Sequence, residues 1–343
     1  MSEPAFAHGG PPLQGCLRAT AEDFEVEEVL GFEPDGSGEH VYLRIEKRLA
    51  NTEWVARQLA HAASVPLMSV GFSGLKDRHA LTRQTFSVHL PGREGPDWTA
   101  LGLEGVRVLS VSRHSRKLKR GVHRTNRFRI RLTDLQGSRR EALACLDRIA
   151  LQGVPNYFGE QRFGHDNGNL RAATALFAGQ RMGRSQRGFA LSAARASIFN
   201  GVLSERVAEG SWNRALDGDV WMLGGTHSIF GPQALDQALQ QRLQSFDIHP
   251  TGPLWGKGPL RSTGKVAEIE RDVAMASGFA AGLEAAELRQ ERRSLRLRPD
   301  LFDPKWESDN ALWLAFSLPS GCFATSVIRE VCATSSRVNM PGS

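Results

Sequence analysis

One polar stretch of the chain, residues 71–84, carries the side chains best suited to acid–base or nucleophilic chemistry. Its only carboxylate, Asp77, lies among four potential cations, Lys76, Arg78, His79 and Arg83. Nearby positive charge favours the ionised form of a carboxylate, so we expect Asp77 to be charged at neutral pH. An ionised carboxylate can act as a nucleophile or as a general base. The alternative is an ordinary surface turn whose acid pairs with its neighbours.

The flanks of this stretch have the period-two pattern of half-buried strands. Apolar side chains occupy every second position in residues 68–72 and again in residues 86–90. Between them, Gly74 allows the backbone to turn or to approach a ligand closely. The sequence therefore predicts two strands joined by a polar loop that carries Asp77.

A second stretch, residues 113–131, holds nine Lys or Arg residues and no Asp or Glu. Such a cluster is typical of a surface that binds nucleic-acid phosphates. In residues 126–132 arginines alternate with apolar side chains, so a strand would bury one face and present guanidinium groups on the other. The candidate contacts to an RNA backbone are Arg124, Arg127, Arg129 and Arg131. The alternative is an edge strand whose positive charge prevents aggregation.

The composition sets wider limits on function. The 43 basic and 37 acidic residues give a formal net charge of +6, a weak indication of an anionic partner. No stretch approaches the length of a membrane span, and residues 1–14 lack the pattern of a secretory signal, which predicts a cytoplasmic protein. The four cysteines include no C-x-x-C pair, so neither a zinc site nor a disulfide framework is indicated.

The first part of the chain mixes predicted strands and helices. Residues 24–29 and 40–46 read as the strands of a hairpin. A helix capped by Asn51 or Thr52 should run to about Ala63. Further strands are expected at residues 106–111 and 126–132. This mixture predicts an α+β fold with a largely antiparallel sheet.

From Gly153 onward the pattern becomes mostly helical, and alternation returns near the carboxyl end. Helices are expected at residues 192–208, 233–246, 266–288 and 323–331, a loop at 251–264, a strand at 312–318 and a frayed tail from Ala333. We therefore assign residues 1–151 and 299–343 to one domain and residues 152–298 to an inserted, mostly helical α/β domain.

Six short motifs occur in order along the chain. They are D-F-E-V at residues 23–26, G-L-K-D-R-H-A at 74–80, N-R-F at 126–128, P-N-Y-F-G-E-Q-R-F-G at 155–164, L-S-A-A-R at 191–195 and G-C-F-A-T-S at 321–326. In these motifs the chain resembles the TruD family of tRNA pseudouridine synthases over nearly its whole length. At position 18 the family often has Lys, whereas this chain has Arg18, which keeps a basic contact but no amine.

The resemblance implies an isomerase that converts a uridine of tRNA, usually at position 13, to pseudouridine with no cofactor and no metal. The enzyme would detach uracil from its ribose, turn it over and rejoin it through carbon, which requires a flipped-out base. The implied fold is a pseudouridine synthase catalytic domain, residues 1–151 and 299–343, with an inserted TRUD domain, residues 152–298. The expected partner is tRNA, and we expect a monomer.

The resemblance also implies roles for individual residues. Asp77 corresponds to the catalytic carboxylate, which attacks the sugar or the uracil ring or removes a sugar proton. The implied substrate-binding residues are Arg18, Phe24, Lys76, Asn126, Phe128 and Phe323. Among them Phe128 would stack on the target base, Asn126 would bond it or orient the loop, and the other two rings would close the pocket.

Other interpretations remain open. Phe128 shares its apolar face with Ile130 and Leu132, so packing in the core is the alternative to stacking on a base. A non-catalytic RNA-binding protein or RNA chaperone, with the loop as a phosphate cradle, would need no Asp77. A glycosidase-like or phosphodiester-cleaving enzyme is disfavoured because neither a pair of carboxylates nor a metal cluster is evident.

Overall fold

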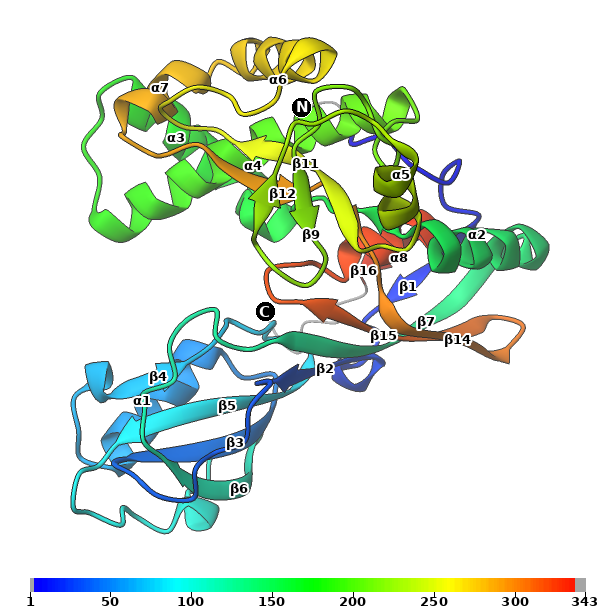
Figure 1. Cartoon of the computed structure of the whole chain (residues 1–343). Coiled ribbons are helices and arrows are strands. Elements are labelled where there is room, and N and C mark those ends of the chain that lie inside the picture. The colour runs from blue at the N-terminus through cyan, green and yellow to red at the C-terminus, as the bar shows by residue number, and fades with distance from the viewer. Residues whose placement is uncertain (1–2, 337–343) are drawn as a thin grey trace. The chain divides into compact units, whose positions relative to one another are not determined.

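The computed structural model describes residues 3–336, which divide into two compact units. Residues 3–12, 140–298 and 322–331 form the helical unit, and residues 13–139, 299–321 and 332–336 form the sheet unit (Figure 1). Each unit is thus built from three segments of the chain. The division into functional domains at residues 151 and 298 stays a prediction.

The sheet unit is a mixed sheet with one helix. Its strands are β1 (Leu13–Leu17), β2 (Phe24–Val29), β3 (His40–Arg48), β4 (Val70–Phe72), β5 (Leu81–His89), β6 (Val106–His114), β7 (Thr125–Gly137), β14 (Asp300–Ser308), β15 (Ala311–Pro319) and β16 (Cys332–Ser336). The main order is β14-β15-β7-β2-β5-β3-β6, with β1, β4 and β16 paired off this path. Only the pairs β2–β5 and β1–β16 are parallel. The predicted α+β class with a mostly antiparallel sheet is confirmed.

Strand β7 lies inside the sheet. Strand β15 pairs with one edge of it, while β1 and β2 follow each other along the other edge. Its alternation is as predicted, because Ile130 and Leu132 are fully buried whereas Arg127 and Arg129 are exposed. The alternative interpretation of this segment as an edge strand is therefore wrong.

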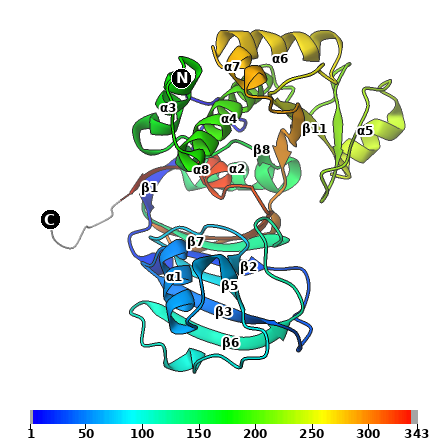
Figure 2. The ribbon, with the colours of Figure 1, turned by 90° about the vertical axis from the view of Figure 1, so that its left-hand side faces the viewer.

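The predicted helix after Asn51 is α1 (Thr52–Ala62), and it covers one face of the sheet beside β4 and β5 (Figure 2). The Asn51 side chain caps it by accepting a hydrogen bond from the Glu53 amide at 2.8 Å. Val55 and Leu59 point into the core and are fully buried. Amphipathic spacing and a capping residue thus sufficed to predict this element.

The predicted hairpin of β2 and β3 is wrong. Strand β5 lies between them, parallel to β2 and antiparallel to β3 over the whole length of β3. The connection of residues 30–39 is longer than a tight hairpin loop, so it leaves room for a third strand.

The helical unit surrounds a long central helix. Its helices are α2 (Arg139–Gln152), α3 (Gly168–Phe177), α4 (Arg184–Ala208), α5 (Gln237–Gln244), α6 (Gly264–Ala276), α7 (Ala280–Ala285) and α8 (Thr325–Val331). Its strands are β8 (Val154–Pro155), β9 (Trp221–Leu223), β10 (Ile229–Phe230), β11 (Ile248–Leu254), β12 (Glu291–Ser294) and β13 (Arg296–Leu297). Helix α4 packs against α3, α6 and β11, with Ala194 and Ile198 buried in the contact.

Four further expectations need correction, and the first is the single helix at residues 266–288, which is two helices, α6 and α7. Helix α4 begins at Arg184 rather than Ser192, and residues 251–254 belong to β11 rather than to a loop. Residues 333–336, expected to fray, pair with β1 through the backbone, which the exposed side chains of Ala333, Thr334 and Ser335 do not reveal. The rest of that tail lies outside the described residues. Within residues 3–336 we find no helix with the length and apolar character that a bilayer crossing requires.

Candidate active site

Asp77 lies on the connection between β4 and β5, residues 73–80, which we call the aspartate loop. The loop is tied to the first turn of α1. The Lys76 amide donates a hydrogen bond to Thr52 Oγ1 at 3.1 Å, and Thr52 Oγ1 donates to Gln84 Oε1 at 3.0 Å. Gln84 Nε2 in turn donates to the Gly74 carbonyl at 3.2 Å. Bonds to both sides of the loop therefore fix its path.

The carboxylate of Asp77 is 15% exposed and meets a cation from far upstream in the chain. Its Oδ2 atom lies 2.8 Å from Nη2 of Arg18, and its Oδ1 accepts a hydrogen bond from the His79 amide at 3.0 Å. Two cations near Asp77 in the sequence have acidic partners elsewhere, because Lys76 of the loop pairs with Glu28 and Arg83 of β5 pairs with Glu25 and Glu46. Arg18 is a cation that contacts the Asp77 carboxylate directly.

Arg18 follows β1 and has a left-handed backbone with φ of 63°. Its guanidinium carbon lies 4.3 Å from the centroid of the Phe24 ring, a cation–π geometry. The Arg18 side chain therefore contacts both the Asp77 carboxylate and the ring of Phe24, one of the predicted substrate-binding residues.

Two of the three predicted aromatic residues are neighbours. Phe24 and Phe128 meet edge to face with centroids 6.3 Å apart, and Phe128 stacks on Phe316 of β15 at 5.4 Å. Phe128 is 9% exposed and Phe24 less, so both are almost buried. Phe323 belongs to the helical unit, in which its ring lies 6.1 Å from that of Phe158.

Phe316 was missed by the sequence analysis. Its place in the alternating residues 312–318 predicts burial, but nothing in the pattern pairs it with Phe128.

Lys76 is nearly buried in an ion pair. Its Nζ lies 3.1 Å from Oε2 of Glu28, a fully buried carboxylate whose Oε1 accepts from the Thr85 amide. This pair joins the aspartate loop to β2. Lys76 therefore supports the loop, and its predicted contact with the substrate stays a prediction.

Asn126 belongs to a buried chain of polar groups at the other side of the loop. Its Nδ2 donates to Nε2 of His123 at 3.2 Å, and His123 Nδ1 is hydrogen-bonded to Ser73 Oγ at 2.6 Å. Burial, with a smaller effect of Lys76, lowers the pKa of His123 to about 4, so the imidazole is neutral at pH 7. Asn126 Oδ1 is a buried acceptor that has no hydrogen-bond donor among residues 3–336.

Lys47 of β3 is a further charged residue at the loop that the sequence analysis missed. Its side chain is fully buried, and its ammonium donates to the carbonyl oxygens of Ala50 and Asp77 at 2.8 and 3.0 Å. Burial lowers the pKa of Lys47 to about 8, an effect that the Asp77 charge opposes. The signal was present in the alternation, which places Lys47 on the same face as Leu43 and Ile45.

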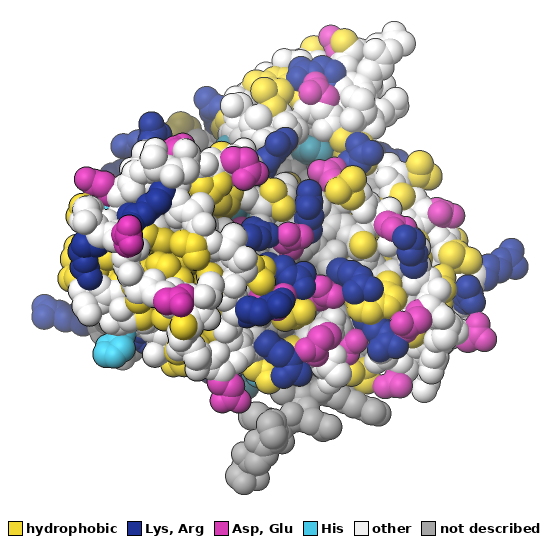
Figure 3. Space-filling model, turned by 90° about the horizontal axis from the view of Figure 1, so that it is seen from below, with side chains coloured by type: hydrophobic (Ala, Val, Ile, Leu, Met, Phe, Trp, Pro, Cys, Tyr) yellow, Lys and Arg dark blue, Asp and Glu magenta, His cyan; other side chains and the backbone are white. Residues whose placement is uncertain are grey.

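The arginine face of β7 is less positive than the local sequence suggests. Arg129 pairs with Glu25 of β2 at 2.9 Å and lies over the Trp313 ring. Arg131 pairs with Glu307 of β14 and lies 3.6 Å from a carboxylate oxygen of Asp23. Acidic side chains therefore lie among the basic ones on the protein surface, as Figure 3 shows for one face.

Two of the four arginines predicted to contact the RNA backbone have no acidic side-chain partner within residues 3–336. Within residues 3–336, the exposed side chains of Arg124 and Arg127 form no ion pair. Arg124 ends a connection, residues 115–124, that we call the basic loop. Its basic residues are Arg116, Lys117, Lys119, Arg120 and Arg124.

The basic loop is anchored beside the aspartate loop. The Gly121 amide donates to the Ser73 carbonyl at 2.8 Å, and the Arg120 guanidinium lies 3.8 Å from the Phe72 ring centroid. Leu118 is almost fully buried and holds the middle of the loop. Several cations are thus fixed close to the start of the loop that carries Asp77.

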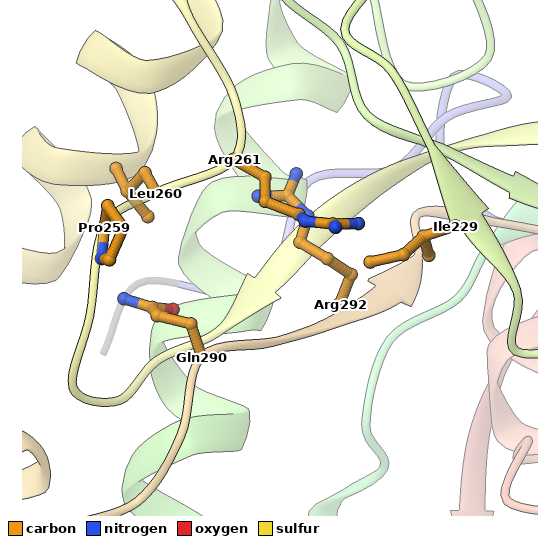
Figure 4. Close-up of a pocket in the computed structure, with 6 residues that line it drawn as sticks. All are labelled: Ile229, Pro259, Leu260, Arg261, Gln290 and Arg292. Atoms are coloured by element: carbon orange, nitrogen blue, oxygen red, sulfur yellow. The ribbon is translucent and has the colours of Figure 1, made fainter.

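Two hollows lie in the helical unit. A cavity of about 410 Å³ is lined by Ile229, Pro259, Leu260, Arg261, Gln290 and Arg292 (Figure 4). Its Arg292 is held by the buried carboxylate of Glu270 at 2.6 Å. An open groove of about 650 Å³ is lined by Arg162, Arg184, Ser185, Gly188, Phe189 and Ser192. None of the predicted substrate-binding residues lines either hollow.

Comparison with known proteins gives a consistent result. The family described as tRNA pseudouridine synthase D (TruD) matches residues 3–180 and 175–331. The tRNA pseudouridine synthase D of Xanthomonas axonopodis pv. citri (strain 306) is 47% identical over 352 residues, which cover 96% of this chain and 95% of that protein. That of Methylococcus capsulatus (strain ATCC 33009 / NCIMB 11132 / Bath) is 48% identical over 329 residues, with 95% and 93% covered.

The fold agrees as well. A crystal structure of the putative tRNA pseudouridine synthase D (TruD) from Methanosarcina mazei superposes with a TM-score of 0.71 at 22% identity and covers 95% of each chain. Sequence motifs, full-length relatives and fold thus point the same way, and the chain belongs to the tRNA pseudouridine synthase D (TruD) family.

Proposed function

We propose that this protein isomerises a uridine of tRNA to pseudouridine and that the Asp77 carboxylate is the catalytic group. Membership of a family named for this activity supports the reaction class. The observation that carries the catalytic assignment is the Asp77 carboxylate, partly exposed, tied at 2.8 Å to Arg18 and set on a loop with fixed ends.

The reaction rearranges bonds without adding or removing atoms. The bond between ribose C1′ and uracil N1 breaks, a bond between C1′ and C5 forms, C5 loses its hydrogen and N1 gains one. An ionised Asp77 can begin this sequence by attacking the sugar or the ring, or by removing a sugar proton. Arg18 stabilises the ionised carboxylate in all three cases.

The target base would be flipped from the tRNA, at a cost of a few kcal/mol, and held beside Arg18 and the Phe24–Phe128 pair. Uracil presents one N–H donor at N3 between two carbonyl acceptors. Asn126 Oδ1, a buried acceptor with no donor among residues 3–336, is suited to accept a hydrogen bond from N3. The role of Phe323, which belongs to the helical unit, stays a prediction.

The RNA backbone would be held by Arg124, Arg127 and the other cations of the basic loop. Within residues 3–336, Arg124 and Arg127 lack the acidic partners that occupy Arg129 and Arg131, whereas Arg120 of the basic loop lies 4.0 Å from a carboxylate oxygen of Glu53. Position 13 of tRNA is proposed as the target because it is the usual substrate of the family. The monomeric state and the cytoplasmic location stay predictions.

Release of tritium from tRNA transcripts labelled at uracil C5 tests the proposal, because C5 loses its hydrogen only when pseudouridine forms. Asp77→Asn should abolish release and change tRNA affinity only a few-fold, since phosphate contacts dominate affinity. Asp97→Asn, an exposed acid of the same unit, is the matched control and should behave as the wild type. Near-normal turnover by Asp77→Asn would refute the catalytic assignment. Binding without release by the wild type would favour the RNA-chaperone alternative.

A further inference from the structure

Lys47 occupies a position where a lysine is costly. It lies on the apolar face of β3 with Leu43 and Ile45, and its side chain is 0% exposed. Removing an ammonium from water is unfavourable unless its donors are bonded, so a buried lysine calls for a specific use of its charge.

Both hydrogen bonds that we find for the Lys47 ammonium go to backbone carbonyl oxygens. One acceptor is Ala50, in the turn that leads to α1, and the other is Asp77 itself. The ammonium therefore ties the aspartate loop to the end of β3. Fixing the Asp77 carbonyl restricts rotation of the peptide group next to the Asp77 side chain, which limits where the carboxylate can point.

Asp77 is thus held by two cations that act on different atoms. Arg18 contacts the carboxylate at 2.8 Å, whereas Lys47 contacts the backbone carbonyl at 3.0 Å. Lys76, on the same loop, pairs with the buried carboxylate of Glu28 at 3.1 Å. Arg18 thus acts on the carboxylate of Asp77, whereas Lys47 fixes its backbone separately.

We infer that Lys47 is a positioning residue for the isomerisation, which fixes the backbone of Asp77 so that the carboxylate meets the sugar–base bond. The inference rests on the proposed catalytic role of Asp77. Small displacements of a catalytic group are expensive in rate, because a reacting atom must be held within a fraction of an ångström of its productive position. Lys47 itself touches no substrate.

The first test is Lys47→Met, which keeps much of the volume and removes the charge. We expect kcat per folded molecule to fall by about 10- to 100-fold, while KM and tRNA affinity stay within about threefold. The matched control is Arg206→Met, which removes a buried cation bound to Asp219 in the helical unit. It should lower the melting temperature and leave kcat per folded molecule unchanged. A kcat of Lys47→Met within threefold of the wild type overturns the inference.

The second test uses the pH dependence and does not require the methionine variant to fold. Burial and Lys76 lower the pKa of Lys47 while Asp77 raises it, and the result is about 8. The wild-type kcat should therefore fall between pH 8 and pH 9.5 as the ammonium loses its proton, with tRNA affinity unchanged. Lys47→Arg keeps its charge over this range and should lose the decline.

The outcomes of the pH test are distinct. A wild-type kcat that stays flat to pH 9.5 overturns the positioning role even if no variant folds. A decline that persists unchanged in a folded Lys47→Arg protein overturns it as well. A wild-type protein that releases no tritium at any pH refutes the proposed function itself. Normal wild-type turnover, together with a kcat that does not change when Lys47 is replaced, refutes only this inference.

Discussion

The guanidinium of Arg18 lies 2.8 Å from the Asp77 carboxylate and 4.3 Å from the centroid of the Phe24 ring, so a single side chain joins the aspartate loop to the aromatic pair. A planar guanidinium can stack on a ring and donate to a carboxylate at the same time, whereas an ammonium acts as a compact point charge. Arginine at this position therefore serves two contacts at once.

Replacing Arg18 separates these contacts. Arg18→Lys keeps the charge but loses the stacking on Phe24, so it should lower kcat by about 3- to 10-fold. Arg18→Met should lower kcat by about 100-fold, because the carboxylate loses this cation. Arg107→Met, which breaks an exposed pair with Glu46, is the control for loss of a surface arginine. Tritium release measures all three. Wild-type kcat in Arg18→Met would show that Asp77 needs no cation on its carboxylate.

The two stacked rings distinguish base stacking from core packing. Truncating Phe128 or Phe316 to Ala should cost about 3 to 5 kcal/mol of unfolding free energy in either case, because both rings are buried. Only Phe128→Ala should also lower the single-turnover rate of the folded protein, since a base-stacking contact contributes about 1 to 3 kcal/mol. Melting curves and single-turnover rates decide. A normal rate in Phe128→Ala would assign the ring to the core and leave Phe24 as the stacking partner.

Salt dependence distinguishes the basic loop from the arginine face of β7. Arg124→Gln and Lys119→Gln should each flatten the plot of log affinity for tRNA against log salt by about 0.7 to 0.9. Arg129→Gln should leave the slope unchanged, because Glu25 and Trp313 already occupy its guanidinium. Filter binding from low to physiological salt measures the slopes. The reverse pattern would restore the arginine face as the phosphate contact.

His123 should make the sheet unit sensitive to acid. Its pKa is about 4 in the folded protein and about 6.5 in an unfolded chain, so the unfolded chain binds the proton first. The contribution of the neutral His123 to the free energy of unfolding is fully present above about pH 6.5. It falls as the pH drops towards 4, and the total loss reaches about 3 kcal/mol. Urea unfolding, monitored by hydrogen exchange of the β7 backbone amides, should show this loss in the wild type but not in His123→Gln. The control variant His61→Gln, on the exposed side of α1, should show the same loss as the wild type. An equal dependence of unfolding free energy on pH in all three proteins would contradict the assignment to His123.

The sequence predicted features that depend on short stretches of chain. Alternation identified the buried and exposed faces of β7, and the Asn51 cap with its helical spacing located α1. The motif around Asp77 pointed to the loop that carries the candidate chemistry. In each case the neighbouring residues alone hold the information, because the period of burial follows from backbone geometry.

Contacts between distant segments escaped prediction. The Asp77 carboxylate pairs with Arg18 from far upstream in the chain, and Glu25 reaches Arg129 from another strand. Such contacts depend on which strands pair and in which register, as in the β2–β7 pair that sets Glu25 opposite Arg129. Lys47 was missed because a lysine in an alternating strand is usually assigned to solvent.

The place of β7 between β2 and β15 also bears on how the chain is made. Strand β15, residues 311–319, pairs with one edge of β7. It leaves the ribosome roughly 10 to 35 s after β7 at common rates of translation. During that interval the edge is open to pairing with other nascent chains. Strand β16, which pairs with β1, is made later still. The sheet unit can therefore be completed only after residues 311–336 have been made, and a chain terminated before them would lack these strands.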